Sequence, residues 1–253
     1  MPIYPTFVGD LKFMTTLCLD LGNTRMKAAA FSNGTLMNVH VLENDGVEQI
    51  QQLIETYKPQ KSILSSVIKH NPLLEEVLKK NTSFHLLNHQ SKLNFILRVG
   101  KPETMGADRI ALASAMVHYY PNKNNLVIGL GSCITYNFIN QFGEFLGGSI
   151  SPGMEMRFKS MHEYTALLPL IQKEWDFPLI GYDTKTNLLS GVTWGMAKEI
   201  EGIVKEYEKK YGNFNVVLTG GDCTYFARLL KNKIFADPEL LFKGLYAISE
   251  TNN

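Results

Sequence analysis

Residues 17–31 of the chain read LCLDLGNTRMKAAAF. Two apolar runs, each typical of a β-strand, flank the short polar turn DLGNT at residues 20–24. Gly22 and Asn23 are residue types that accept a positive φ at little cost. A strand–turn–strand hairpin is therefore predicted over this stretch.

The polar groups of this turn suit phosphate oxygens. The predicted hairpin presents backbone N–H groups, the Thr24 hydroxyl and the Lys27 ammonium on one side. Asp20, at the end of the first strand, is placed to hold a hydrated Mg²⁺, which prefers carboxylate and water ligands. The alternative is an ordinary hairpin whose aspartate caps its own turn.

Three further stretches strengthen the phosphate interpretation. They are GADR at residues 106–109, GLGSCIT at residues 129–135 and VVLTGG at residues 216–221. With these motifs the chain resembles the type III pantothenate kinases, of the actin-like ATPase and sugar kinase superfamily. The signatures of that family are an Asp-x-Gly-Asn-Thr-x-x-Lys turn, a Gly-x-Asp-Arg segment, an Asp-x-Gly-Thr-Ala-x-Thr turn and a Thr-Gly-Gly strand end. The similarity follows the family's order from about residue 14 to the C-terminus.

The resemblance implies an α/β fold, a duplicated RNase H-like (actin-like ATPase) architecture with the active site in the cleft between two similar halves. The sequence itself repeats a three-strand opening, once from the first hairpin and again from residue 125. We therefore expect an N-terminal half at residues 14–121 and a C-terminal half at residues 122–253. Residues 1–13 are expected to form a disordered extension.

The activity implied is the ATP-dependent phosphorylation of pantothenate to 4'-phosphopantothenate, the first step of coenzyme A biosynthesis. The resemblance assigns ATP to the first turn, the second turn and the glycine pair: Asp20, Leu21, Gly22, Asn23, Thr24, Arg25, Met26, Lys27, Ser132, Gly220 and Gly221. It assigns pantothenate to Val99, Gly106, Ala107, Asp108, Arg109 and Thr184.

Asp108 is the candidate catalytic base. A carboxylate near the acceptor hydroxyl can orient it and take its proton, and Arg109 offers a planar fork for a substrate carboxylate. The alternative is an aspartate that stabilises a helix N-terminus, with Arg109 exposed to solvent. The family likeness favours the catalytic role.

Two positions depart from the family pattern. Gly129 stands where the family has an aspartate associated with a bound monovalent cation, so dependence on K⁺ or NH₄⁺ is in doubt while the divalent cation at Asp20 is retained. Val99 stands where family members often carry a tyrosine, which can alter the substrate pocket. Two rival functions follow: a kinase for another small hydroxy acid, and a catalytically weak nucleotide-binding regulator.

Composition limits the remaining possibilities. The 253 residues are 45% hydrophobic and 19% charged, with a formal net charge of +1. These values are typical of a globular domain and give no basic footprint for nucleic acid. No apolar stretch reaches the ~18 residues that a membrane span needs. The partners expected are ATP, pantothenate and a second copy of the chain, with no nucleic acid and no membrane.

The metal-binding and redox residue types carry no motif of their own. Cys18, Cys133 and Cys223 form no CxxC pair, so they are interpreted as buried, inert strand residues of a cytoplasmic protein. The six histidines have no ligand spacing. The longest predicted helix, residues 187–211, carries an apolar stripe that suits either the core or a homodimer interface.

Overall fold

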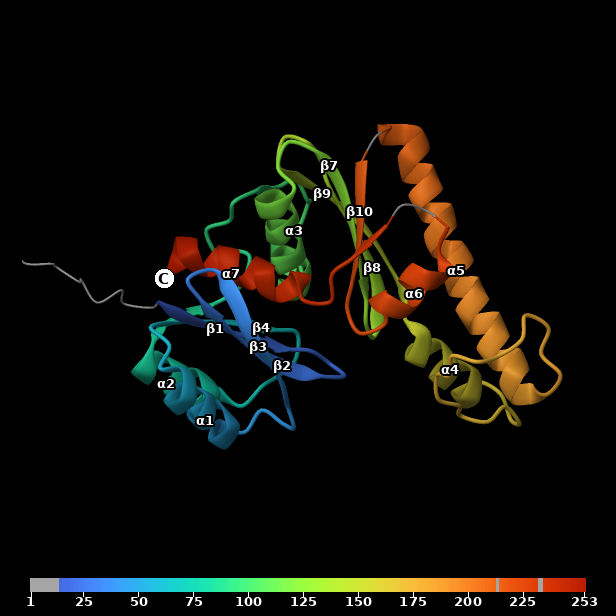
Figure 1. Ribbon diagram of the computed structural model, residues 1–253, viewed down its shortest axis with the longest axis horizontal. Coiled ribbons are helices and arrows are strands. Elements are labelled where there is room, and N and C mark those ends of the chain that lie inside the picture. The colour runs from blue at the N-terminus through green and yellow to red at the C-terminus, as the bar shows by residue number, and fades with distance from the viewer. Residues whose placement is uncertain (1–13, 213, 232–233) are drawn as a thin grey trace, which may run out of the picture.

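The computed structural model describes residues 14–212, 214–231 and 234–253. It contains two mixed β-sheets with helices packed against them (Figure 1). The extension predicted at residues 1–13 lies outside the described residues. None of the described helices is long and apolar enough to cross a membrane.

The first sheet has five strands in the order β3-β2-β1-β4-β5. The hairpin of β1 and β2 confirms the one predicted from the opening stretch. Two helices follow β3 and β4, and Asn71 caps the second of them by accepting a hydrogen bond from the Leu73 N–H at 3.1 Å. The elements are β1 (Thr15–Leu21), β2 (Met26–Ser32), β3 (Thr35–Leu42), α1 (Val47–Tyr57), β4 (Lys61–Ser66), α2 (Pro72–Asn81) and β5 (Ser83–Leu86).

The second sheet has six strands in the order β11-β10-β7-β8-β9-β6. Its helices include α5, whose capping box at Asp183 and Thr186 starts the helix three residues before the predicted position. The elements are β6 (Ile96–Leu97), β7 (Asn124–Leu130), β8 (Cys133–Ile139), β9 (Glu144–Pro152), α4 (Met154–Glu163), α5 (Thr184–Tyr211), β10 (Phe214–Thr219), α6 (Cys223–Leu229) and β11 (Phe235–Ala236).

The two sheets repeat one topology. In the first, an antiparallel meander β1-β2-β3 is extended by the parallel strands β4 and β5. In the second, the meander β7-β8-β9 is extended in the same way by β10 and β11. β1 therefore corresponds to β7, and β4 to β10. This repetition confirms the predicted duplicated fold.

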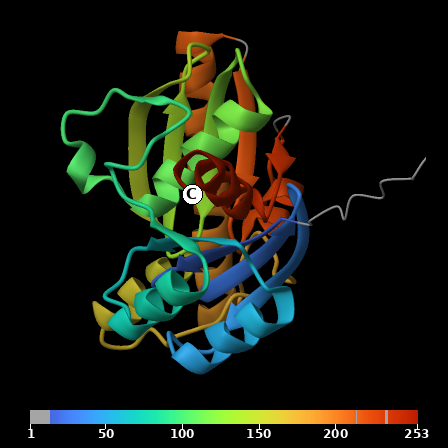
Figure 2. The same cartoon turned by 90° about the vertical axis from the view of Figure 1, so that its left-hand side faces the viewer.

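Two helices lie between the halves. Helix α3 (Ala107–Tyr119) and helix α7 (Leu240–Asn252) cross in contact, as Figure 2 shows. Small residues allow the close approach, because a side chain at Gly244 would collide with the backbone of Ala111. The same core cluster includes Cys18 of the first sheet and Val127 of the second. The chain's last helix thus packs against elements of the N-terminal half, across the boundary proposed near residue 121.

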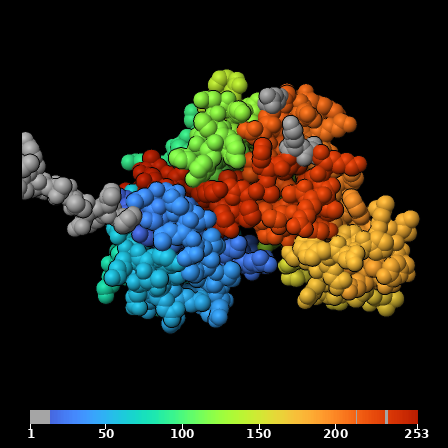
Figure 3. All heavy atoms as spheres, in the orientation of Figure 1, coloured from blue at the N-terminus to red at the C-terminus, as the bar shows by residue number. Residues whose placement is uncertain are grey.

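Two irregular segments separate these elements. Residues 88–105 contain only the short strand β6 and a 3₁₀ turn, Pro102–Thr104. Residues 164–183 contain no helix or strand. In Figure 3 this second segment and α4, in amber, project from the molecule, and a notch separates them from the first half.

Candidate active site

Two turns that are far apart in the sequence meet at a cleft. The first turn joins β1 to β2, and the second joins β7 to β8. Thr24 Oγ1 of the first lies 2.5 Å from Ser132 Oγ of the second. The cleft has a volume of about 430 Å³. Its walls include most of the predicted site residues: Asp20, Gly22, Asn23, Thr24, Arg25, Lys27, Gly106, Asp108, Arg109, Ser132, Gly220 and Gly221.

The first turn differs from the prediction in its backbone. Neither Gly22 nor Asn23 has a positive φ. Glycine at position 22 favours close backbone approach instead, because a β-carbon there would stand a tight 3.0 Å from the Arg25 carbonyl oxygen. The Gly22 N–H donates to that same oxygen at 3.1 Å and closes the turn. Asp20 and Lys27 face each other across the hairpin.

The Asp20 carboxyl is held in a partly buried position. Ser65 Oγ donates a hydrogen bond to Asp20 Oδ1 at 3.1 Å. Burial, with a contribution from the charge of Asp108, raises the pKa of Asp20 to about 7, although Ser65 and Lys27 oppose the shift. A cation bound at this carboxylate would favour its ionised form.

The residues present fit a magnesium ion that would bind both a protein carboxylate and the phosphates of the nucleotide. Among the described residues, no group of three or more His, Cys, Asp or Glu could hold a metal ion. Mg²⁺ does not require such a cage, because it commonly binds one or two carboxylates together with phosphates and several waters. Asp20, on the wall of a cleft that also holds Asp108, meets that requirement.

Asp108 lies in the first turn of α3. Gly106 caps this helix, and any side chain at position 106 would collide with the Asp108 carboxylate. Burial raises the pKa of Asp108, while the backbone N–H and the charge of Arg109 oppose the rise. A carboxylate with a raised pKa is a stronger base, and therefore a better proton acceptor.

Arg109 is held rather than free in solvent. Its Nε donates to Asn137 Oδ1 at 2.6 Å, and its guanidinium lies 5.7 Å from the centre of the Phe145 ring. Asn137 is fully buried in β8, and its Nδ2 donates to the Val127 carbonyl at 3.3 Å. The sequence analysis did not identify Asn137 as a residue of the site. Its only signal is a polar residue inside the apolar run CITYNFI.

The glycine pair brings the backbone of the second half to the cleft. Gly220 has a φ of +93°, and a side chain there would collide with the backbone of Leu130. A β-carbon on Gly221 would stand 3.6 Å from Arg25 Nη1, so the first turn reaches across to this strand end. Sterics therefore require glycine at position 220, whereas a β-carbon at position 221 would make an ordinary contact.

A lysine and an aspartate on the cleft wall carry no sequence signal. Lys173 Nζ pairs with Asp222 Oδ1, and their side chains are only 24% and 9% exposed. Lys173 lies in the irregular segment 164–183, where no periodicity or motif marks it. Two residues later, the Trp175 ring packs on Tyr225 with ring centres 3.7 Å apart. These contacts attach the segment to the side of the cleft formed by the glycine pair and α6.

Gly129 lies in β7 between two threonines. In the sheet it pairs with Thr135 of β8 and with Thr219 of β10. A β-carbon at position 129 would stand 2.7 Å from Thr135 Oγ1. The space next to this glycine is thus partly filled by a hydroxyl.

Five predicted site residues do not line the cleft. Val99 packs against the core cluster around α3. Thr184 is exposed at the first position of α5. Leu21, Met26 and Ala107 are sequence neighbours of residues that do line the cleft wall.

Comparison with known proteins adds independent information. The family model for type III pantothenate kinase matches residues 16–206. A type III pantothenate kinase of Christiangramia forsetii is 42% identical over 238 residues, covering 93% of this chain and 98% of that protein. The enzyme of the same name from Cytophaga hutchinsonii is 39% identical, covering 93% of this chain and 99% of its own length.

Solved structures show a similar fold. A conserved Baf family protein from Campylobacter jejuni superposes with a TM-score of 0.58 at 24% identity, covering 92% of this chain and 97% of its own. A glucokinase from an Antarctic psychrotroph superposes with a TM-score of 0.52 at 10% identity, covering 94% and 99%. At such low identity these likenesses bear on the fold alone.

Proposed function

This chain belongs to the type III pantothenate kinase family, and on that premise we propose that the cleft between its halves is the active site. The function of the chain is the ATP-dependent phosphorylation of pantothenate in coenzyme A biosynthesis. The observation that carries the proposed location is the contact of Thr24 with Ser132, which brings two glycine turns together beside Asp20 and Asp108.

Asp20 is assigned to the divalent cation, as Mg²⁺. When bound, the ion neutralises charge on the phosphates, which a loose phosphoryl-transfer transition state requires. The backbone of the first turn, Lys27 and Ser132 donate to the phosphate oxygens. No monovalent cation is assigned, because Gly129 offers no carboxylate.

Asp108 is assigned as the base that orients the acceptor hydroxyl of pantothenate and takes its proton. Arg109 is assigned to the substrate carboxylate, and its hydrogen bond to Asn137 fixes the direction of the guanidinium fork. Asp108 and Arg109 are adjacent on α3, so one helix start positions both groups. The two buried carboxylates also argue against an idle, regulatory site, because carboxyl groups are costly to bury.

The adenine end of ATP is assigned to Gly220 and Gly221. Without side chains, this strand end lets a flat ring approach the backbone. Lys173 and Asp222 lie beside it and add one charge of each sign to the wall. This end of the cleft therefore combines an open backbone with a paired lysine and aspartate.

A homodimer is proposed through the segment at residues 164–183. Its apolar side chains are unusually exposed: Leu167 is 92%, Ile180 84% and Tyr182 81% exposed. Contiguous exposed apolar surface commonly marks an interface. Thr184 follows this surface directly, so a second copy docked here is the means by which Thr184 would approach bound pantothenate.

Light scattering after size-exclusion chromatography tests the dimer. Ile180→Asp should convert the protein to a monomer, because a buried charge in an apolar interface is costly. Leu73→Asp, at an exposed position on α2, should leave the mass unchanged. Equal masses for wild type and Ile180→Asp would contradict this interface.

A cytoplasmic location is also proposed. The three cysteines are free thiols, and two of them, Cys18 and Cys223, are buried. Free thiols persist in a reducing compartment. Burial raises the pKa of both, which makes them poorly reactive.

Substrate choice is tested by measuring ADP release in the presence of pantothenate and a panel of other small hydroxy acids. Pantothenate should give the highest kcat/KM. A better rate with another acid would show that this cleft, with Val99 behind it, serves a different acceptor.

A further inference from the structure

Ser65 and Asp20 are neighbours across two parallel strands. They lie opposite each other in the register of β1 and β4, so their side chains share one face of the sheet. Ser65 is fully buried, and its Oγ donates to Asp20 Oδ1 at 3.1 Å. The other oxygen, Oδ2, lies toward the first turn, 4.0 Å from where a β-carbon on Gly22 would stand. The serine therefore occupies one carboxylate oxygen and leaves the other facing the turn.

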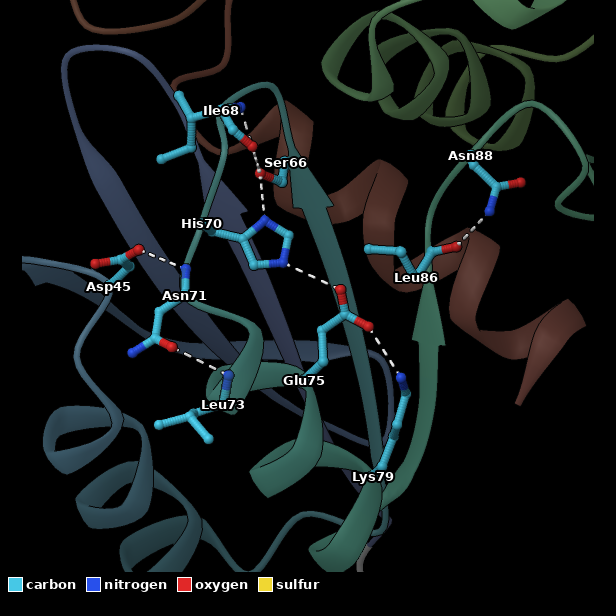
Figure 4. A network of polar contacts seen from close by, with 10 residues as sticks. All are labelled: Asp45, Ser66, Ile68, His70, Asn71, Leu73, Glu75, Lys79, Leu86 and Asn88. Atoms are coloured by element: carbon cyan, nitrogen blue, oxygen red, sulfur yellow. Dashed lines mark hydrogen bonds and ion pairs between the residues drawn. The ribbon is translucent and has the colours of Figure 1, made fainter.

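Strand β4, which carries Ser65, is held in place by hydrogen bonds at the next residue, Ser66. His70 bridges Ser66 Oγ, 3.0 Å from its Nδ1, and Glu75 Oε1, 3.2 Å from its Nε2 (Figure 4). Lys79 Nζ donates to the second oxygen of Glu75 at 2.9 Å. This network ties the end of β4 to helix α2, so the position of the Ser65 hydroxyl is fixed by packed elements.

The second half of the fold has a strand pair equivalent to that of Asp20 and Ser65, but it lacks the carboxylate. Gly129 of β7 lies opposite Thr219 of β10, in the positions that Asp20 and Ser65 hold in the first half. Thr219 is 3% exposed, and its hydroxyl has no hydrogen-bond partner among the described residues. The same strand pairing therefore places a hydroxyl beside each position, and only Asp20 supplies an acceptor for it.

We propose that Ser65 is the positioning residue of the metal-binding carboxylate. By donating to Oδ1 it holds the Asp20 side chain in the orientation that presents Oδ2 to a divalent cation on the phosphates. This inference rests on the proposed role of Asp20. Partners of metal ligands act in this way generally, and their loss lowers metal affinity about 10–100-fold.

The test measures Mn²⁺ binding to the full chain by electron paramagnetic resonance in the presence of ADP. Ser65→Ala should weaken Mn²⁺ binding about 10–100-fold, while ADP affinity without metal stays unchanged. Ser62→Ala is the matched control, because Ser62 is equally buried in the same strand and its Oγ lies 2.5 Å from Thr82 Oγ1, away from Asp20. That control should bind Mn²⁺ like the wild type.

A second pair of variants isolates the hydroxyl from packing. Ser65→Thr keeps it, and the equivalent position of the second half already carries a threonine. Ser65→Val has the same shape as Ser65→Thr without the hydroxyl. Mn²⁺ affinity should be close to the wild-type value in Ser65→Thr and reduced in Ser65→Val, and equal affinities in the two would overturn the proposal even if Ser65→Ala does not fold.

Asp20→Asn separates this inference from the function on which it rests. If Asp20→Asn loses Mn²⁺ binding and the Ser65 variants keep it, the role of Ser65 alone is overturned. If Asp20→Asn itself binds Mn²⁺ normally, the assignment of the cation to Asp20 fails, and the role of Ser65 fails with it.

Discussion

The hydroxyls of Thr24 and Ser132 lie 2.5 Å apart, although 108 positions separate the two residues in the chain. One belongs to the glycine turn of the first sheet and the other to that of the second. Phosphate oxygens placed between the turns would receive donors from both halves of the duplicated fold. Binding of ATP at this position would therefore depend on the relative position of the halves.

Removal of either hydroxyl should weaken ATP binding. A hydrogen bond to a charged group contributes about 1.5–3 kcal/mol, so Ser132→Ala and Thr24→Ala should each raise the Kd for ATP about 10–100-fold. Calorimetry measures this directly. Ser160→Ala is the control, because the Ser160 hydroxyl donates to the Arg157 carbonyl within α4. An unchanged Kd in both cleft variants would place the phosphates elsewhere.

Divalent cation binding should depend on pH through Asp20. Its pKa of about 7 means that a proton competes with the metal below that pH. The apparent affinity for Mg²⁺ should therefore rise as pH increases toward 7 and level off above it. Titration of activity with Mg²⁺ at several pH values measures the effect. Asp20→Asn should impair Mg²⁺-dependent turnover, with partial rescue by excess Mg²⁺, and an unchanged titration would make Asp20 a turn residue only.

The raised pKa of Asp20 has the opposite effect on the stability of the metal-free protein, which should fall as pH rises. The folded chain keeps a proton on Asp20 at pH values where an unfolded chain, with an ordinary pKa of 3.8, has lost it. The free energy of unfolding should therefore fall as pH rises from about 4 to about 7. In Asp20→Asn this part of the pH dependence should be absent, as thermal melts of the metal-free protein would show.

Activity should not require a monovalent cation. A weakly hydrated K⁺ needs several oxygen ligands, and Gly129 supplies no carboxylate. Turnover should be measured against K⁺ at constant ionic strength, with a large organic cation as the balance, since general screening also changes ATP binding. Saturable, many-fold activation by K⁺ or NH₄⁺ would contradict the prediction.

Gly129→Asp gives the converse test, with a structural condition. The new carboxylate would lie beside the Thr219 hydroxyl, which has no partner in the described part of the chain, but its β-carbon would stand 2.7 Å from Thr135 Oγ1. Thr135 must therefore move, which a β-branched residue in a strand does with difficulty. K⁺ activation is expected to appear more strongly in Gly129→Asp combined with Thr135→Ala than in Gly129→Asp alone.

The crossing of α3 and α7 should be sensitive to one added methyl group. Gly244→Ala places a β-carbon against the Ala111 carbonyl, and such overpacking costs about 1–3 kcal/mol, or roughly 2–12 °C in Tm for a chain of this size. Gly202→Ala, in α5 with open space around it, should be neutral or stabilising. Equal Tm values for the two variants would contradict the packing described.

Local patterns in the sequence predicted the parts of the fold that depend on local physics. The first hairpin and the repeated three-strand opening both follow from residue type and spacing. Gly22 and Asn23 form the predicted hairpin without the positive φ that their residue types tolerate. Glycine also serves close backbone approach, and a sequence does not distinguish the two uses. The strands β6 and β11 have two residues each, too few to show a period.

The site was predictable where it consists of motifs and not where it consists of tertiary contacts. Asp20, Asp108 and Ser132 lie in recognisable turns, and the structure brings them to one cleft. Lys173 reaches that cleft from an irregular segment, and Asn137 contacts Arg109 from another strand, so neither has a local signal. The role of Ser65 depends on the register of β1 and β4, which only the folded sheet reveals.

The central claim is that Asp108 takes the acceptor proton in this cleft, and the turnover of Asp108→Asn tests it most directly. Asparagine keeps the shape and removes the base, so kcat for pantothenate phosphorylation should fall about 10²–10⁴-fold while the affinity for ATP changes little. A turnover near that of the wild type would contradict the account and remove Asp108 from the chemistry.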